Sequence, residues 1–294
     1  KSKKEISEII SRKKREIIHQ KSVAEWQSNM SKDEYIQKYQ KIKQHIIDGD
    51  IYQVNLTHRL EAETQKDSRA LFFDVAQKNK VGNLAYIESD QVEIISASPE
   101  RFIQISDNKT IETFPIKGTR PRGKAEEQDR DLKNKLINSE KEAAELNMIT
   151  DLMRNDMGKI AEVGSVEVVD PRKIHKFKTI WHTSSHIKAK VKEDTSSIEA
   201  LLSMFPGGSI TGCPKKRAIE IIDKLEPTAR GVYTGSIGYI FPDDSLDFNI
   251  AIRTIVKKNT KVYLQVGGGI VFDSKEKDEY QETFDKAKSF LDVL

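Results

Sequence analysis

The sequence contains little that would suit an oxidising compartment or a membrane. Cys213 is the only cysteine among 294 residues, so no disulfide can form within the chain, and the cysteine and histidine clusters of zinc sites are missing. The longest uncharged runs, near 231–242 and 262–272, are far shorter than the roughly 18 apolar residues of a membrane span, and the first residues do not predict a signal peptide. We therefore expect a protein of the reducing cytoplasm that does not enter a membrane.

The sequence also lacks an excess of charge of one sign. Lysine and arginine number 49, aspartate and glutamate number 46, and the net charge is +3, so the balance does not require nucleic acid or a membrane surface as a partner. Residues 3–20 predict an amphipathic helix with a basic face. A solvated face and a contact with nucleic acid both fit this helix, and the near-neutral charge of the whole chain favours the solvated face.

The remaining pattern predicts helices and short strands in succession. Ser31 and Glu34 form a capping box before a helix at 32–48, and Gly49 follows its last turn. Strand-like runs lie at 51–60, 83–88, 92–97, 101–106, 109–113, 232–241, 246–256 and 261–266. Further helices are predicted at 125–157, 196–204, 214–224 and 275–292.

Strands grouped in this way indicate an α+β fold with large antiparallel sheets, packed as a sandwich with helices outside. No proline- or serine-rich linker divides the chain, and its length allows one large domain. Because the chain begins with Lys1 inside a helical pattern, we expect a leading portion to be missing. Residues 1–50 would be the helical remnant of that portion, and residues 51–294 would form the main domain.

Lys117 lies in the segment PIKGTRPRG, residues 115–123, beside a glycine and two arginines. The like charges of Arg120 and Arg122 would favour the neutral, nucleophilic form of its amine. A lysine in a glycine- and proline-containing loop is also commonly a solvated surface group. Lys117 is therefore a candidate nucleophile whose assignment depends on other segments.

Two predicted helices each carry a pair of glutamates three residues apart. Glu142 and Glu145 share one helix face, as do Glu279 and Glu282, with Lys286 four residues further on. Carboxylates stacked in this way repel each other unless a hard divalent cation such as Mg²⁺ relieves the repulsion. Solvated acidic faces, and a surface ion pair between Glu282 and Lys286, would explain the same spacing.

Glycine-rich segments precede two of the predicted helices. The amides of 267–269 could approach an anion closely, and the helix start after 205–213, near Ser209 and Thr211, could hold a carboxylate or a hydroxyl. The spacing of a nucleotide-binding phosphate loop is absent there. Glu100, in the segment SASPERF, is either a surface carboxylate or, if buried, a general acid with a raised pKa.

Eight segments in one order make the sequence resemble the chorismate-utilising enzyme family. They lie between residues 51 and 294 and read SPERF, PIKGTRPR, DLMRND, PGGSITGCPK, GSIGY, IAIRT, GGGIV and EYQETFDKA. The resemblance implies the chorismate-binding fold, chorismate as the substrate and Mg²⁺ as the cofactor. Residues 51–294 would then be the chorismate-binding catalytic domain.

The resemblance also implies a role for each candidate site residue. Glu145 and Glu282 would bind Mg²⁺, with Glu142 and Glu279 as outer helpers. The residues that would hold or line the substrate are Gln53, Thr119, His182, Thr211, Arg253, Gly267, Gly268, Gly269 and Lys286. Considered alone, His182 would more often be an ordinary packed histidine, and only its place in this series of segments makes it a candidate.

Two positions make the sequence similar to one branch of the family, which forms 4-amino-4-deoxychorismate. Relatives that add water to chorismate, the isochorismate and salicylate synthases, carry a lysine base where Gln53 stands, and a glutamine cannot deprotonate water. Anthranilate synthases carry a small alanine where Lys117 stands. The alternative within the family is component I of anthranilate synthase.

In the mechanism that this branch implies, neutral Lys117 attacks C2 of the chorismate ring while Glu100 protonates the departing C4 hydroxyl. Ammonia then adds at C4 and expels the lysine, in a pathway to 4-aminobenzoate and folate. The family takes this ammonia from a glutamine amidotransferase partner, component II. Cys213, in its glycine- and proline-containing loop, lacks the context of a glutaminase nucleophile.

Two other classes of function are compatible with parts of the sequence. A non-catalytic interaction module would have no use for four repelling carboxylates. A nucleic-acid binder would use the basic helix at 3–20, and its binding would weaken strongly with salt. The series of eight segments favours an enzyme over both.

Overall fold

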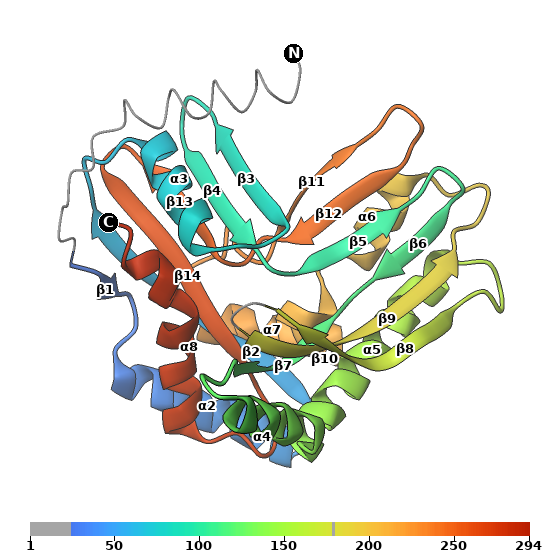
Figure 1. The fold of residues 1–294 in the computed structure, drawn as a ribbon, viewed down its shortest axis with the longest axis horizontal. Helices are drawn as coiled ribbons and strands as arrows, with labels where there is room; N and C mark the ends of the chain where they lie inside the picture. Colours follow the sequence, from blue (N-terminus) through green and yellow to red (C-terminus); the bar gives the residue numbers. More distant parts are fainter. Residues whose placement is uncertain (1–24, 178–179) are drawn as a thin grey trace.

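The structure is a computed structural model that describes residues 25–177 and 180–294. Two seven-stranded antiparallel sheets form the body of the molecule, and helices pack against them (Figure 1). This arrangement confirms the predicted α+β fold with large antiparallel sheets. The helix predicted at 3–20 lies outside the described residues.

The first sheet joins segments from both ends of the chain. Its strand order is β1-β2-β14-β13-β4-β3, with β10 also paired to β2, and all of its pairings are antiparallel. These strands are β1 (Gln27–Ser28), β2 (Gln53–Glu63), β3 (Asn83–Glu88), β4 (Glu93–Ser98), β10 (Gly212–Cys213), β13 (Thr254–Lys258) and β14 (Lys261–Ile270).

The second sheet is built mainly from the middle of the chain. Its order is β11-β12-β5-β6-β9-β7, with β8 paired to β9, and these pairings are also antiparallel. The strands are β5 (Arg101–Ile105), β6 (Thr110–Thr113), β7 (Ile116–Pro121), β8 (Glu167–Lys176), β9 (Ile180–Lys190), β11 (Ser236–Ile240) and β12 (Leu246–Ile250).

The described helices range from a single 3-10 turn to the long helix α5. They are α2 (Lys32–Ile47), α3 (Ser68–Lys78), α4 (Glu126–Ile137), α5 (Glu140–Ile160), α6 (Ser197–Met204), η1 (Gly208–Ile210), α7 (Lys215–Leu225) and α8 (Glu276–Leu291). Within the described ranges, none of these helices has the length and apolar character needed to span a bilayer.

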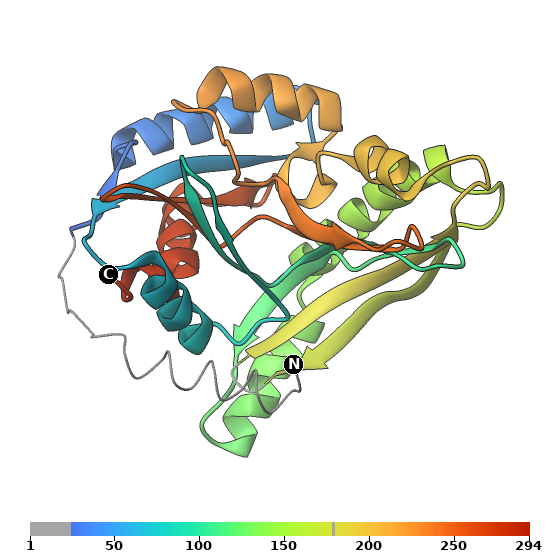
Figure 2. The same cartoon turned by 90° about the horizontal axis from the view of Figure 1, so that it is seen from above.

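Three hydrophobic clusters hold the helices against the sheets. Ile103 and Ile149 belong to the cluster between the second sheet and helices α5 and α6. Leu71 and Phe290 belong to the cluster that fixes α3 and α8 on the first sheet. Tyr35 lies in the cluster that joins α2 and α7 to β2 (Figure 2). These clusters hold α5 against the second sheet and α8 against the first sheet.

The side chains of strand β2 point alternately to a helix-covered face and to a polar face of the first sheet. Val54 and Leu56 belong to the cluster with α2 and α7, so the alternation of a strand turns Gln53 and Asn55 to the other face. Asn55 pairs with Gly269 of β14, and residues opposite each other in a ladder share a face. This polar, glycine-containing face is where an interior site can form.

Two segments that the sequence predicts as continuous are divided. The helix predicted at 125–157 is the pair α4 and α5, because Ser139 caps a new helix by accepting a hydrogen bond of 3.4 Å from the amide of Glu142. The strand predicted at 246–256 is β12 and β13, since the chain leaves the second sheet after Ile250 and enters the first sheet at Thr254. Hydrophobic periodicity continues through both breaks and therefore does not reveal them.

Several elements are absent from the sequence-based prediction. Helix α3 and strands β7, β8 and β9 were not predicted, and β8 contains Pro171 and many charged residues, which are poor strand formers. Pairing with β9 outweighs this local preference. The strand-like runs at 83–113 form antiparallel strands as expected, but β4 pairs with β13 and β5 pairs with β12, so these strands are divided between the two sheets.

The capping box at the start of α2 is confirmed and is open to a stability test. The Ser31 hydroxyl accepts from the amide of Glu34 at 3.2 Å, and the Glu34 carboxylate accepts from the amide of Ser31 at 2.7 Å. We expect Ser31→Ala to lower the free energy of unfolding by about 1 kcal/mol, because the amide of Glu34 loses the hydroxyl that accepts its hydrogen bond. Urea unfolding followed by circular dichroism measures this. Ser31→Asn, an equally good cap, should remain close to wild type, and an equal loss in both variants would contradict the capping role.

Candidate active site

A cavity of about 750 Å³ opens beside the first turns of α5 and α8. Its walls are formed by β2 and β14 of the first sheet, by β7 and β9 of the second sheet, and by the connections that precede β5 and β13. Lysine, arginine and glutamate side chains from the second sheet, from both helices and from the two connections line it. The cavity therefore collects charged groups that are far apart in the sequence.

Lys117 enters the cavity from strand β7 rather than from a loop. Its backbone pairs with Thr183 of β9, and the Thr183 hydroxyl donates a hydrogen bond to the Lys117 carbonyl. The register shifts between Lys117 and Thr119, where Gly118 has a φ of +79°. A Cβ at Gly118 would lie 3.0 Å from the Glu142 carboxylate, so both the conformation and the space require glycine.

The pKa of Lys117 is lowered from its ordinary value, and burial is the largest cause. The carboxylates of Glu145 and Glu100 oppose this shift, whereas the ammonium of Lys286 adds to it. The expectation that the neighbouring arginines favour the neutral form of Lys117 is wrong. Arg120 is paired with Glu142 at 2.6 Å, and Arg122 is paired with Asp129 at 2.6 Å, so both arginine charges are balanced by carboxylates.

Glu100 is a buried carboxyl group in the connection between β4 and β5. Its Oε1 accepts a hydrogen bond of 2.6 Å from the Ser209 hydroxyl, and only 9% of the residue is exposed. Burial raises the pKa of Glu100, while the Ser209 hydrogen bond and the Lys117 charge oppose the rise. A carboxyl group in this environment tends to keep its proton, as a general acid must.

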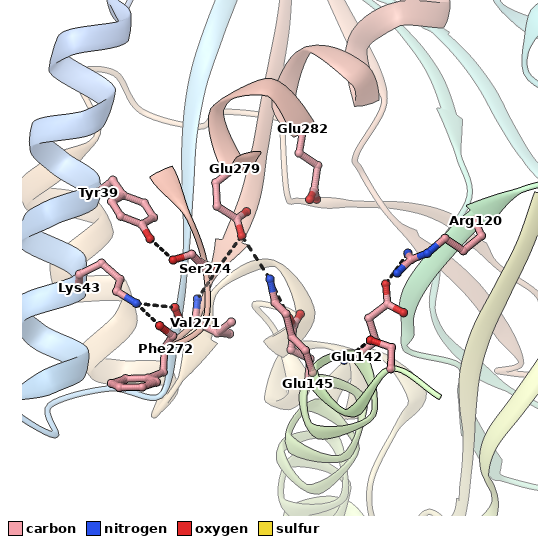
Figure 3. Close-up of polar contacts among 12 residues, drawn as sticks. Tyr39, Lys43, Arg120, Glu142, Glu145, Val271, Phe272, Ser274, Glu279 and Glu282 are labelled. Atoms are coloured by element: carbon pink, nitrogen blue, oxygen red, sulfur yellow. Dashed lines mark hydrogen bonds and ion pairs between the residues drawn. The ribbon is translucent and has the colours of Figure 1, made fainter. Parts of the chain in front are cut away.

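The carboxylates of Glu145 and Glu279 approach each other from two helices (Figure 3). The Lys141 amine lies between them, 3.9 Å from Glu145 and 3.7 Å from Glu279. Burial raises the pKa of both carboxyl groups. Glu279 also accepts a hydrogen bond of 2.6 Å from the hydroxyl of Ser274. Two acidic side chains thus share one ammonium group at the edge of the cavity.

Glu282 is neutralised by a different lysine on its own helix. Its Oε1 lies 2.7 Å from Nζ of Lys286, which also donates a hydrogen bond of 3.1 Å to the Gly267 carbonyl. Burial alone would raise the pKa of Glu282, but the charge and the hydrogen bond of Lys286, together with the charges of Lys117 and Lys141, outweigh it and lower the pKa. These groups gather over Gly268, where a Cβ would lie 3.3 Å from Glu279 and 3.6 Å from Lys286.

Glu142 differs from the other three glutamates because an arginine holds it. Its Oε1 accepts from Arg120 at 2.6 Å, whereas its Oε2 is buried without a hydrogen-bond partner among the described residues. Carboxylate oxygens, one of them unpaired, are the donors that suit a hard cation such as Mg²⁺. In residues 25–177 and 180–294, no three acidic, histidine or cysteine side chains are grouped closely enough to hold a metal ion as they lie. The carboxylate oxygens are donors of the type that Mg²⁺ prefers, and the carboxylates now paired with lysines would have to shift to bind it.

Arg253 contributes an unpaired positive charge to the cavity. No hydrogen bond or ion pair of its guanidinium is found within the described residues, and burial lowers its pKa. Its backbone has a φ of 53°, an unusual conformation for a residue with a side chain. An arginine held in this way is available to an anion that enters the cavity.

His182 lies in the cavity wall on β9 as a neutral imidazole. Burial lowers its pKa to about 4, with a smaller contribution from His175. The ring packs against Phe177, with the ring centroids 4.6 Å apart. His182 can therefore offer an imidazole hydrogen bond to a ligand without adding charge.

The other predicted substrate residues divide into two groups. Thr119, Gly267 and Gly269 line the cavity. Gln53, Thr211 and Gly268 lie outside its lining as the described residues define it. The Thr211 hydroxyl donates to the Gly207 carbonyl at 2.9 Å and so stabilises its own loop. Gln53 is fully buried beside Gly269, and neither atom of its amide has a hydrogen-bond partner among the described residues.

Sequence analysis missed several polar groups in the cavity wall. Asn55, Arg120, Lys141 and Tyr233 were not considered as site residues, and all four line the cavity. Tyr233 is buried, and burial raises its pKa to about 12. The sequence gives a signal only for Asn55, which lies in a strand of alternating polar and apolar residues, two positions after Gln53 and therefore on the same face.

Comparison with known proteins gives consistent results. The family model described as chorismate binding enzyme matches residues 1–292. The chain is 44% identical to aminodeoxychorismate synthase component 1 of Escherichia coli over 92% of this chain and 60% of that protein. It is 41% identical to an anthranilate synthase component 1 of Haloarcula marismortui, over 93% of this chain and 54% of that protein.

A solved structure shares the whole architecture. Anthranilate synthase component I from Streptococcus pneumoniae superposes with a TM-score of 0.84 and 31% identity, over 99% of this chain and 67% of that one. The chain spans about three fifths of the length of the curated relatives it matches. The match to the family model, the fold and the residues around the cavity agree, and the chain belongs to the chorismate binding enzyme family.

Proposed function

We propose that the chain is the chorismate-binding part of an aminodeoxychorismate synthase component 1, which converts chorismate and ammonia to 4-amino-4-deoxychorismate. The observation that carries this proposal is a buried lysine amine of lowered pKa and a buried carboxyl group of raised pKa lining the same cavity. Burial shifts Lys117 toward its nucleophilic form and Glu100 toward its protonated form, which is the combination that substitution of a ring hydroxyl requires.

The reaction consists of two balanced substitutions. The Lys117 amine forms a bond to C2 of the ring, the ring double bonds shift, and the C4 hydroxyl leaves as water with the proton of Glu100. The attached amine loses one proton in this step, which restores the proton balance. Ammonia then forms a bond to C4, the double bonds shift back, and the bond from Lys117 to C2 breaks. The added ammonia gives up one proton and the departing Lys117 nitrogen takes one up, so that Lys117 leaves as the amine. The enolpyruvyl group is retained throughout.

The positive groups of the cavity suit the two carboxylates of chorismate. Arg253 is unpaired among the described residues, and Lys286 lies at the glycine-rich end of β14. One carboxylate would bind Arg253 and the adjacent amides, and the other would lie near the acidic side chains of α5 and α8. Mg²⁺ would be held by Glu145 and Glu282, which the resemblance implies as ligands, and also by Glu279, which lies with Glu145 on either side of the Lys141 amine. It would supply the positive charge that fixes this ring carboxylate.

Gln53 supports an amine rather than water as the second nucleophile. Its buried amide, unpartnered among the described residues, has no basic atom that could deprotonate water. Ammonia needs no such base, because its lone pair is already available for attack. We infer that a glutamine amidotransferase partner delivers this ammonia, and that the product serves 4-aminobenzoate and folate synthesis in the cytoplasm.

A second candidate function is anthranilate synthesis. Relatives named as anthranilate synthase component 1 are nearly as similar as those named as aminodeoxychorismate synthase, and the solved structure described above carries the anthranilate name. Lys117 favours the first candidate, because an attacking amine at C2 blocks the position where an amino group would be added to form anthranilate.

The first test concerns Lys117 as the attacking group. With chorismate and Mg²⁺ but no ammonia, the protein should gain the mass of chorismate less one water on the peptide that contains Lys117. Lys117→Ala should give no adduct and should reduce 4-amino-4-deoxychorismate formation by more than about a thousandfold, the scale seen when a nucleophile is removed. A coupled assay with ammonium and a lyase that releases 4-aminobenzoate measures the product.

The control for this test is Lys173→Ala, which removes an exposed lysine paired with Asp170 on the same sheet. It should leave adduct and product formation unchanged. Release of 2-aminobenzoate alone by the wild-type protein would reject the aminodeoxychorismate proposal in favour of anthranilate synthesis.

The second test uses pH. Below the lowered pKa of Lys117 the amine is protonated, so the rate of adduct formation should rise with pH. Above the raised pKa of Glu100 the carboxyl group has lost its proton, so the rate should fall again. We expect a bell-shaped profile when adduct formation is followed by mass spectrometry without ammonia. In Glu100→Gln the rate should be about 10²–10⁴-fold lower, without the fall at high pH. A wild-type fall that survives in the variant would remove Glu100 from the role of general acid.

The third test concerns Arg253 as the anion-binding group. Arg253→Met should raise the KM for chorismate roughly ten- to a hundredfold, since a hydrogen bond to a charged group contributes about 1.5–3 kcal/mol. Steady-state kinetics measures the change. Arg59→Met is the matched control, because Arg59 is paired with Glu61 on β2 and does not line the cavity. An unchanged KM in Arg253→Met would exclude it as a carboxylate-binding residue.

A further inference from the structure

Lys141 lies between two helices, at a position in α5 where a positive charge is unfavourable. It is the second residue of α5 after the cap at Ser139. The start of a helix carries a partial positive charge, so a lysine there is disfavoured, whereas its neighbours Glu140 and Glu142 are favoured. Lys141 therefore gains no stabilisation from the helix end, and another interaction must account for its position.

The interaction is with carboxylates from two elements. The Lys141 amine lies 3.9 Å from Oε1 of Glu145, one turn along α5, and 3.7 Å from Oε1 of Glu279 on α8. Glu279 is nearly fully buried, with 6% of its side chain exposed, and Glu145 has 16% exposed. The one ammonium group thus compensates two enclosed carboxylates that would otherwise repel each other.

Lys141 and Lys286 differ in how firmly they are held. Lys286 has two contacts, an ion pair with Glu282 and a hydrogen bond to the Gly267 carbonyl. Lys141 makes only the two long ion pairs within the described chain, and 41% of its side chain is exposed. Its amine can therefore move into solvent by rotation of its own side chain, without displacement of either helix.

We propose that Lys141 is a positioning residue. Its ammonium group occupies the place between Glu145 and Glu279 where a divalent cation binds, and the cation displaces this group into solvent. This inference rests on the proposed function in one respect only, which is that the proposed reaction uses a divalent cation. Lys141 holds the two carboxylates close together before the cation arrives. The exchange replaces one positive charge by two, and with Lys286 retained, the three carboxylates Glu145, Glu279 and Glu282 become fully balanced.

A purely structural ion pair would act differently. If Lys141 only ties α5 to α8, its removal should separate the carboxylates and weaken binding of a cation. If it competes with the cation for the same oxygens, its removal should strengthen that binding. The two roles therefore predict changes of opposite sign in one measurement.

The experiment compares Mg²⁺ binding to the wild-type chain and to Lys141→Met, without substrate, by calorimetric titration, with Mn²⁺ and electron paramagnetic resonance as a second probe. We expect Lys141→Met to bind either cation about tenfold more tightly, because it no longer has to displace two partly exposed ion pairs. Lys141→Arg retains the charge and should remain at or below the wild-type affinity. Lys135→Met removes an exposed lysine of α4 and should change the affinity less than about twofold.

A thermal measurement separates competition from a general effect of charge. Without a divalent cation, Lys141→Met should melt lower than wild type, by about 2 °C, since Glu145 and Glu279 then repel without compensation. With saturating Mg²⁺ the variant should melt at or above the wild-type temperature. A structural ion pair would lower the melting temperature under both conditions.

Two results would overturn the proposal, and they differ in whether the proposed role of the metal is rejected as well. Equal or weaker cation binding by Lys141→Met, with wild type still binding Mg²⁺, would reject displacement and leave the proposed function intact. No binding of Mg²⁺ or Mn²⁺ by wild type or variant, with or without chorismate, would reject both the displacement and the role of the metal. Trapping of the Lys117 adduct tests the chemistry separately.

Discussion

The cavity depends on the enclosure of an amine and several carboxyl groups away from water. Burial lowers the pKa of Lys117 and raises that of Glu100, because a charge loses hydration when it is enclosed. Each group is thereby shifted toward its neutral form, although each would be charged in water. Opposite charges in the same cavity limit both shifts. The proposed chemistry needs the neutral amine and the neutral acid together, and this enclosure favours both.

This enclosure arises because the chain passes from one sheet to the other. The segment between β12 and β13 crosses from the second sheet to the first, and Arg253 stands at the crossing with a φ of 53°. The positive φ directs the chain into β13 while the guanidinium lines the cavity. Gly118 allows a bulge in β7 beside Lys117, on the opposite wall. The unusual backbone positions therefore coincide with the charged groups of the site, as expected where function imposes local strain.

Much of the fold and of the residue set could be predicted from the sequence. Local signals were sufficient for α2, since Ser31 and Glu34 cap it within four residues, and for the acidic pairs of α5 and α8, since helical spacing alone puts each pair on one face. Long-range pairing could not be predicted in this way. Whether β4 pairs with β5 or with β13 depends on contacts between distant segments, and the strand formed by residues 167–176 exists because β9 lies beside it.

The electrostatic partners of the site were the least predictable feature, and the reason is geometric. Arg120 and Arg122 are near Lys117 in the sequence, but strand alternation and the approach of α4 and α5 pair them with Glu142 and Asp129. The ammonium group that acts on Lys117 belongs instead to Lys286 on α8. Sequence proximity identifies charges that can interact along one element. The packing of α5 and α8 against the sheets determines which charges interact across the cavity, and these charges modify the lowering of the Lys117 pKa that burial causes.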